Sequence, residues 1–109
     1  MISRRDYIFT IGYEGNAAVV DGALKKRYGS LSTEQLAEQQ LFKQAVCSAV
    51  YERTSGSSQN SGNEGDKALE RVLEIYNSKN ERKIGSVEEL QRLFGVYEVP
   101  EGIAKITVV

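Results

Sequence analysis

Two helix-capping patterns, each followed by apolar residues at helical spacing, constrain the fold of this 109-residue chain more than any other feature. Ser86 and Glu89 form one of them, because a serine and a glutamate three positions apart satisfy free backbone N–H groups at a helix start. Gly95 suits the left-handed residue that ends many helices. The apolar residues between them share one helical face: Val87, Leu90, Leu93 and Phe94. The pattern predicts a short amphipathic helix that begins after Ser86 and ends before Gly95.

Ser32 and Gln35 form the second capping pattern, and Leu31 before it is placed to pack back onto the first helical turn. Apolar residues then recur every three or four positions as far as about Arg53: Leu36, Ala37, Leu41, Ala45, Val46, Ala49 and Val50. The stripe predicts either one continuous helix or two shorter helices that meet near Gln40.

Two more segments have helical spacing. Asn16 suits the N-cap of a helix over residues 17–28, whose last turn carries three cations that complement the helix dipole and is followed by Gly29. Asp66 suits the N-cap of another helix, which fades at residues 77–80. The apolar face of this last helix consists of Leu69, Val72, Leu73 and Tyr76.

Aromatic and β-branched residues predict strands near both ends of the sequence. Tyr7–Ile11 is bounded by a glycine and has strand composition. Val96–Val99 and Ile103–Val109 flank a Pro-Glu-Gly turn signal, which indicates a hairpin. Exposed apolar strands invite aggregation, so we expect Ile106 and Val108 to pair and pack beside the first strand.

The order of these elements predicts an α+β fold, because strands and helices do not alternate regularly. We expect a single domain over residues 1–109, with a small sheet of two to three strands packed against three to four amphipathic helices. Residues 54–65 contain no apolar side chain, and such a composition does not offset the entropy of ordering the backbone. We therefore expect a flexible Ser/Gly/Asn loop at about 54–65.

Composition excludes much chemistry. The chain has no histidine, which removes the commonest general base and the His-containing metal sites. The single cysteine, Cys47, forms neither an internal disulfide nor a thiolate zinc site, and a helical apolar setting favours a buried, unreactive thiol. The apolar run at residues 7–11 is too short for a signal-peptide core or a membrane span. We expect a non-catalytic cytoplasmic protein without metal or other cofactor and without a membrane partner.

A first candidate binding site joins the predicted first strand to the predicted helix at residue 17. Its members are Gly12, Tyr13, Gly15 and Asn16. A helix N-terminus presents free N–H groups and a positive dipole end, which favour an anion such as the phosphate of a nucleotide. Complete dinucleotide and P-loop motifs are absent, and Glu14 adds negative charge. A tight turn with an ordinary helix cap accounts for the same residues.

A second candidate lies in residues 33–50, whose two apolar segments are typical of a helix-turn-helix unit. Lys43, Gln44 and Ser48 would then read base edges. The chain has 14 Lys+Arg against 15 Asp+Glu and a net charge of -1, so it lacks the usual basic footprint of a DNA-binding domain. Residues 40–42 have no turn chemistry, and a continuous amphipathic helix accounts for the same residues without strain.

The sequence favours a third function, a small interaction or regulatory domain that associates with itself or with another protein. Four amphipathic helices and only two or three strands leave more apolar surface than one small sheet covers. The six tyrosines also suit an interface, because each has an apolar body and a polar tip. A homo-oligomer would complete the burial of the remaining apolar surface.

Overall fold

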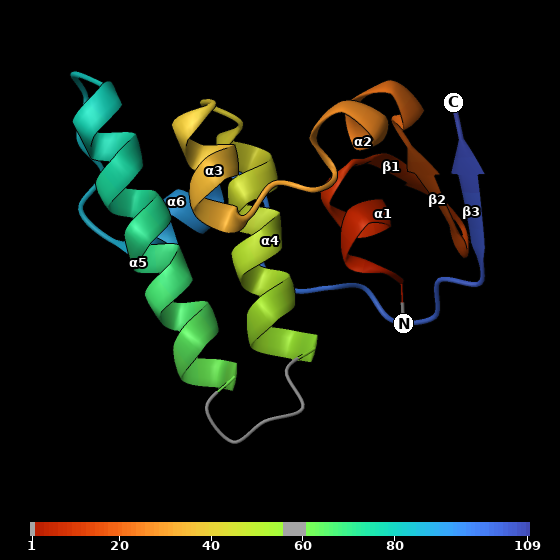
Figure 1. The fold of residues 1–109 in the computed structure, drawn as a ribbon. Helices are drawn as coiled ribbons and strands as arrows, with labels where there is room; N and C mark the ends of the chain where they lie inside the picture. Colours follow the sequence, from red (N-terminus) through yellow and green to blue (C-terminus); the bar gives the residue numbers. More distant parts are fainter. Residues whose placement is uncertain (1, 56–60) are drawn as a thin grey trace.

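Four helices stand together in one half of the molecule and a three-stranded sheet lies in the other (Figure 1). The computed structural model describes residues 2–55 and 61–109, except for the side chains of residues 54–55 and 61–66. The helical half contains α3 (Thr33–Glu38), α4 (Phe42–Ser55), α5 (Ser61–Lys79) and α6 (Val87–Phe94). The sheet half contains α1 (Arg4–Ile8), β1 (Thr10–Glu14), β2 (Ala17–Val20), α2 (Gly22–Tyr28) and β3 (Lys105–Val108). The fold is α+β, as the order of elements predicts.

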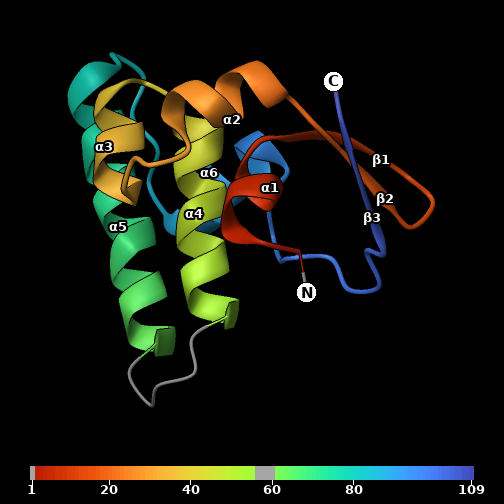
Figure 2. The ribbon, with the colours of Figure 1, turned by 45° about the vertical axis from the view of Figure 1, so that its right-hand side comes forward.

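Helix α4 is the centre of the helical half. It packs against α3, α5 and α6, and on its other side against α1. Figures 1 and 2 show α5 running alongside it. Every residue from Ala45 to Val50 is buried, so this stretch of α4 has no solvent face. Small side chains allow neighbours to approach from all sides, and a helix surrounded in this way is a core helix.

The predicted capping box at Ser32 and Gln35 is confirmed; Ser86 is confirmed as the N-cap of α6, but the Glu89 carboxylate accepts from the Gly85 N–H and not from that of Ser86. Ser32 accepts a hydrogen bond from the Gln35 N–H at 3.2 Å, and the Gln35 side chain accepts one from the Ser32 N–H at 2.9 Å. Ser86 accepts from the Glu89 N–H at 3.2 Å, while Gly95 ends α6 with a φ of 69°. These local signals place the starts of α3 and α6 and the end of α6 where the sequence predicts.

The long stripe after Ser32 forms two helices, so the alternative with a break near Gln40 is correct. Gln40 has a φ of 63°, a left-handed backbone conformation that is uncommon for residues other than glycine. The Leu41 N–H donates to the Leu36 carbonyl at 2.9 Å across this turn. This bond is the mark of a helix C-terminus closed by a left-handed residue.

The predicted helix start at Asp66 is wrong, because α5 begins at Ser61. The predicted loop at 54–65 overlaps α4 as far as Ser55 and α5 from Ser61 onwards. Residues 56–60 of that loop lie outside the described residues. The predicted apolar face of α5 is confirmed: Leu69 and Val72 are buried, and Leu73 and Tyr76 pack partly buried against the core.

The predicted strand over 7–11 is wrong in its first half. Ser3 accepts a hydrogen bond from the Asp6 N–H at 3.3 Å and so caps α1, which includes Tyr7 and Ile8. The strand starts only at Thr10. The Ser-x-x-Asp capping signal at the start of the segment outweighs the strand propensity of the aromatic residues after it.

The predicted helix over 17–28 is also divided. Ala17–Val20 form β2, which pairs antiparallel with β1 through a turn at Gly15 and Asn16. Gly15 has a φ of 60°, a conformation that suits glycine in a tight turn. Asp21 caps the helix instead, accepting from the Leu24 N–H at 3.1 Å. Asn16 is therefore a turn residue and not a helix N-cap.

β3 pairs with β2 in parallel and not with the first strand, so the strand order is β1-β2-β3. The expected packing of Ile106 and Val108 beside the first strand is wrong in this respect. Residues Val96–Val99 form no strand, and the predicted C-terminal hairpin is reduced to β3 alone. The chain between α6 and β3 passes beneath α1 before it turns up along β2 (Figure 1).

Helix α1 joins the two halves. The Arg4 guanidinium lies between them and donates to the Leu31 carbonyl at 2.9 Å and to the Ser48 hydroxyl at 2.8 Å. Burial lowers the pKa of Arg4, although the nearby Glu52 carboxylate opposes this shift. Tyr7 on the same helix is buried and donates to the Glu98 carbonyl at 3.3 Å. One short helix thus contacts both the helical core and the segment that leads to β3.

Candidate functional site

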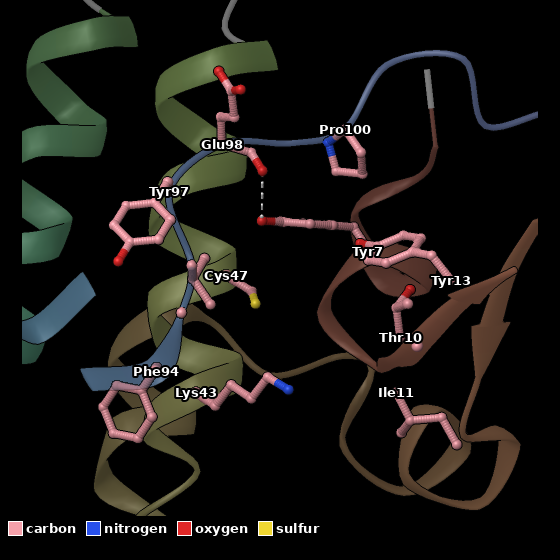
Figure 3. Close-up of a pocket in the computed structure, with 13 residues that line it drawn as sticks. Tyr7, Thr10, Ile11, Tyr13, Lys43, Cys47, Phe94, Tyr97, Glu98 and Pro100 are labelled. Carbon is pink, nitrogen blue, oxygen red and sulfur yellow. Dashed lines mark hydrogen bonds between the residues drawn. The ribbon is translucent and has the colours of Figure 1, made fainter. Parts of the chain in front are cut away.

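A cavity of about 250 Å³ lies at the junction of the two halves. Strand β1 forms one wall with Thr10, Ile11 and Tyr13, and α4 forms the opposite wall with Lys43 and Cys47. Tyr7 and the chain segment 94–100 close the remaining sides. Figure 3 shows the Lys43 amine and the Cys47 sulfur pointing from α4 toward β1. We call this space the junction cavity.

Three residues from the two predicted sites come together at the junction cavity. Gly12 and Tyr13 belong to the predicted anion site, and Lys43 belongs to the predicted DNA-reading set; all three line the cavity. Gly15 and Asn16 are exposed on the hairpin turn and do not line it. The sequence thus predicted three residues of this site but assigned them to two separate candidate sites.

The structure removes the physical basis of the predicted anion site. Gly12 and Tyr13 lie inside β1, and the segment after Asn16 is a strand. The next helix, α2, starts beyond β2 at Gly22 and not directly after Asn16, as the prediction required. Free N–H groups at a helix start are thus missing from the Gly12–Asn16 loop.

The segment predicted as a helix-turn-helix forms α3, a turn and α4, and much of α4 is buried in the core. Ser48 is fully buried, where it donates to or accepts from the Thr33 hydroxyl at 2.7 Å. Gln44 is half-buried, and Lys43 alone of the three is exposed. A recognition helix must present a face to the groove, whereas most of α4 lies in the core. Ser48 as a base reader is therefore wrong.

Apart from Lys43 and Glu98, the side chains that line the junction cavity are uncharged at neutral pH. Burial raises the pKa of the Cys47 thiol from 9.0 to about 11, although the nearby Lys43 ammonium lowers it somewhat. Burial also raises the pKa of Tyr7 and, less strongly, that of Tyr13. At neutral pH the thiol and both phenols are protonated. The predicted buried, unreactive thiol agrees with this setting.

A second feature is the outer edge of the sheet. Ile106, Val108 and Val109 are large apolar residues with 39%, 57% and 68% of their surfaces exposed. The register places Ile106 opposite Ala18 and Val108 opposite Val20, so both share a sheet face with residues that are fully buried. We call the strand edge formed by residues 105–109 the β3 edge. Its apolar face extends beyond β2, against which α1 packs.

The cations near the start of the chain divide among several environments. Arg5, Lys25 and Lys26 line one shallow hollow beside α2. Lys25 pairs with the Asp6 carboxylate at 2.5 Å, and Arg27 stacks over the Tyr28 ring at 5.4 Å. Such pairs are ordinary features of a solvated helix surface.

Sequence reasoning missed Tyr7 and the segment 94–100 as parts of the cavity. They come from α1 and from the chain after α6, which are far apart in sequence. No spacing rule brings such elements together. The abundance of tyrosine was the one available signal, and it pointed to partly buried edges without placing them.

Comparisons with known proteins add no family or fold assignment: no family model, no curated protein and no solved structure matches the chain. Among the described residues, no group of three or more His, Cys, Asp or Glu side chains is placed to hold a metal ion. In residues 2–55 and 61–109, no helix is both long and apolar enough to cross a membrane.

Proposed function

We propose that this protein is a small interaction domain that associates with itself through the β3 edge. The observation that supports this proposal is the exposed apolar face of β3, which continues a buried sheet face. Edge strands of this kind are templates for another strand, because their outward N–H and C=O groups have no ladder partner.

The backbone of β3 has its hydrogen-bonding groups arranged for such pairing. The N–H groups of Lys105 and Val109 point inward, to the carbonyls of Asn16 at 3.3 Å and Val20 at 2.9 Å. Successive residues of a strand point to opposite sides, so the N–H groups of Ile106 and Val108 point outward. A second copy of β3 is a suitable partner for these outward groups.

Two copies meet best with β3 antiparallel to its mate, around a two-fold axis. A register that sets Ile106 of one copy opposite Val108 of the other keeps all four side chains on one sheet face. The two three-stranded sheets would then form one continuous sheet. The apolar face that ends at β3 in one copy would continue into the other.

The dimer is expected to be weak and reversible. Stable interfaces bury roughly 800 Å² on each partner, and a four-residue edge with its neighbours offers less than this. Full burial of an isoleucine or valine contributes about 1.5 to 3 kcal/mol, and part of that burial already exists in the single chain. We therefore expect dissociation on dilution.

Equilibrium sedimentation over a range of concentrations tests the proposal with two charge substitutions. Ile106→Lys places a cation in the proposed interface and should weaken dimerisation at least about tenfold, since two buried apolar side chains are lost per dimer. Leu93→Lys is the matched control, because Leu93 is 56% exposed on α6 and lies away from β3. It should leave dimerisation unchanged.

Three results would overturn the proposal. The unmodified chain could stay monomeric at the highest concentration tested. Both variants could dimerise as well as the unmodified chain, which would place the interface elsewhere. Leu93→Lys could abolish dimerisation while Ile106→Lys does not, which would move the interface to α6.

A further inference from the structure

We infer that the junction cavity binds a small organic acid made of one planar ring and a carboxylate. This inference is independent of self-association, because β3 lines no part of the cavity. Three observations support it: the size of the space, the character of its walls and the position of its single inward-pointing charge.

The volume of the junction cavity limits the ligand to one ring. Ligand sites for drug-sized molecules measure roughly 300 to 1,000 Å³, so about 250 Å³ suits something smaller. An apolar cavity of about 150 Å³ is enough to hold a benzene ring. The remaining space suits a carboxylate and the carbon that carries it.

The walls of the cavity match a planar apolar body. Tyr13 and Ile11 lie on the β1 side, and both are largely exposed for such residues, at 47% and 59%. The Tyr7 ring lies at one end, buried, with its hydroxyl turned to the Glu98 carbonyl (Figure 3). Aromatic rings stack or meet edge to face with other rings, and such contacts contribute beyond simple burial.

The charge within reach of the cavity is positive. Of the described residues that line it, Lys43 and Glu98 are the charged ones. Figure 3 shows the Glu98 carboxylate directed away from Lys43 and Cys47, whereas the Lys43 amine extends into the space before β1. Cys47, Tyr7 and Tyr13 are protonated and neutral at pH 7, so they do not repel an anion. An ammonium beside neutral donors is a suitable partner for a carboxylate.

The test uses phenylacetate as the probe, with two relatives that each lack one feature. Phenylacetamide keeps the ring and removes the charge, while butyrate keeps the carboxylate and removes the ring. Amide chemical shifts of the isotope-labelled full chain report both affinity and location. We expect phenylacetate to shift residues 10–13 and 94–98 and to bind more tightly than either relative.

Substitutions then assign the two contacts. Lys43→Gln should weaken phenylacetate binding by about tenfold, the lower end of what a hydrogen bond to a charged group contributes, and should leave phenylacetamide binding unchanged. Tyr13→Val replaces the ring by another side chain that favours strands and should weaken binding of both ring-bearing probes. Lys26→Gln on α2 is the charge-matched control, because Lys26 does not line this cavity. It should bind phenylacetate like the unmodified chain.

Several outcomes would overturn the inference. They are equal binding of the acid and the amide, equal binding of butyrate and phenylacetate, shifts centred outside the cavity, or no shift up to the solubility limit of phenylacetate. Unchanged amide spectra of Lys43→Gln away from residue 43 would show that the variant is folded. Loss of binding in that variant is then loss of a contact.

Discussion

The helical half and the sheet half differ in how completely they bury their apolar side chains. Leu36, Leu69 and Leu90 come from three different helices, and each is fully buried around α4. On the sheet, Val20 is fully buried, but Val108 beside it on β3 is 57% exposed. The helical half buries these leucines within one chain, although Leu93 on α6 is 56% exposed, whereas the sheet half leaves the apolar face of β3 exposed.

The difference follows from geometry. An amphipathic helix has one apolar stripe to bury. The helices α3, α5 and α6 all pack against α4, so α4 helps to bury their stripes. A sheet has a whole face to cover, and α1 and α2 are only five and seven residues long. α1 packs against β2, and the start of α2 meets the C-terminal end of β3, where Gly22 lies next to Val108 and Val109. Incomplete cover at an edge strand is what makes that edge available to a partner.

The largest expected effect comes from replacing one apolar side chain in each half by alanine. Leu69→Ala removes a fully buried side chain from the helical core and should lower the free energy of unfolding by about 2 to 5 kcal/mol. Val108→Ala at the β3 edge should cost less than about 1 kcal/mol, because that side chain is largely exposed. Urea unfolding at low protein concentration measures both. Equal losses would show that the two halves are not distinct in packing.

A second test concerns the junction between the halves. The pKa of Cys47 is about 11 in the folded chain against 9.0 ordinarily, so the folded state keeps its proton where the unfolded state loses it. The free energy of unfolding should therefore fall as pH rises from about 9 to about 11. The full effect of this two-unit difference is about 2 to 3 kcal/mol.

Cys47→Ala provides the comparison for this pH dependence. Tyrosines and lysines titrate in the same range, so the difference between the two proteins isolates the thiol. The gap in stability between them should narrow with rising pH, because only the unmodified chain carries this linkage. A gap that stays constant from pH 8 to pH 11 would mean that the thiol is not held in a dry site.

A third test separates the sheet from the helical core. A Cβ added at Gly22 would lie 2.6 Å from the Val108 side chain and 3.1 Å from the Val109 carbonyl. Gly22→Ala should therefore push β3 away from α2 and cost about 1 to 2 kcal/mol, as overpacking does. Hydrogen exchange should speed up at the amides of β3 and stay slow in α4. Uniform acceleration in both halves would instead indicate one cooperative unit.

The smallest expected effect lies in the turn between α3 and α4. Gln40 has a φ of 63°, a conformation that glycine adopts without a Cβ penalty. Gln40→Gly should raise the free energy of unfolding by about 0.5 to 1 kcal/mol, as relief of left-handed strain outweighs added chain entropy. Gln39→Gly is the control and should destabilise, because Gln39 has a φ of -80°. Thermal unfolding resolves the opposite signs.

The sequence predicted best where the deciding interaction spans a few residues. Ser86, Glu89 and Gly95 specify α6 through contacts three to four positions apart, and the structure reproduces that helix. The strand predicted over 7–11 was wrong because a different local interaction decided the structure there. A local cap at Ser3 overrode aromatic residues whose strand propensity depends on packing.

The rest depends on contacts that no local pattern encodes. Ala17–Val20 suit a strand or a buried helix equally well, and their pairing with both β1 and β3 decides the matter. The junction cavity likewise requires α1, β1, α4 and the chain after α6 to meet. Gly12, Tyr13 and Lys43 could be named from the sequence, but their common location could not.

The pairing of β3 with β2 also sets an order of assembly. The β1–β2 hairpin joins neighbours in the sequence, and α3 with α4 does the same. β3 pairs with β2 across all the helices from α2 to α6, and contacts so distant in sequence form slowly. β3 is therefore expected to dock late in folding and to detach early in unfolding. Until it docks, the edge exposed to other chains is that of β2.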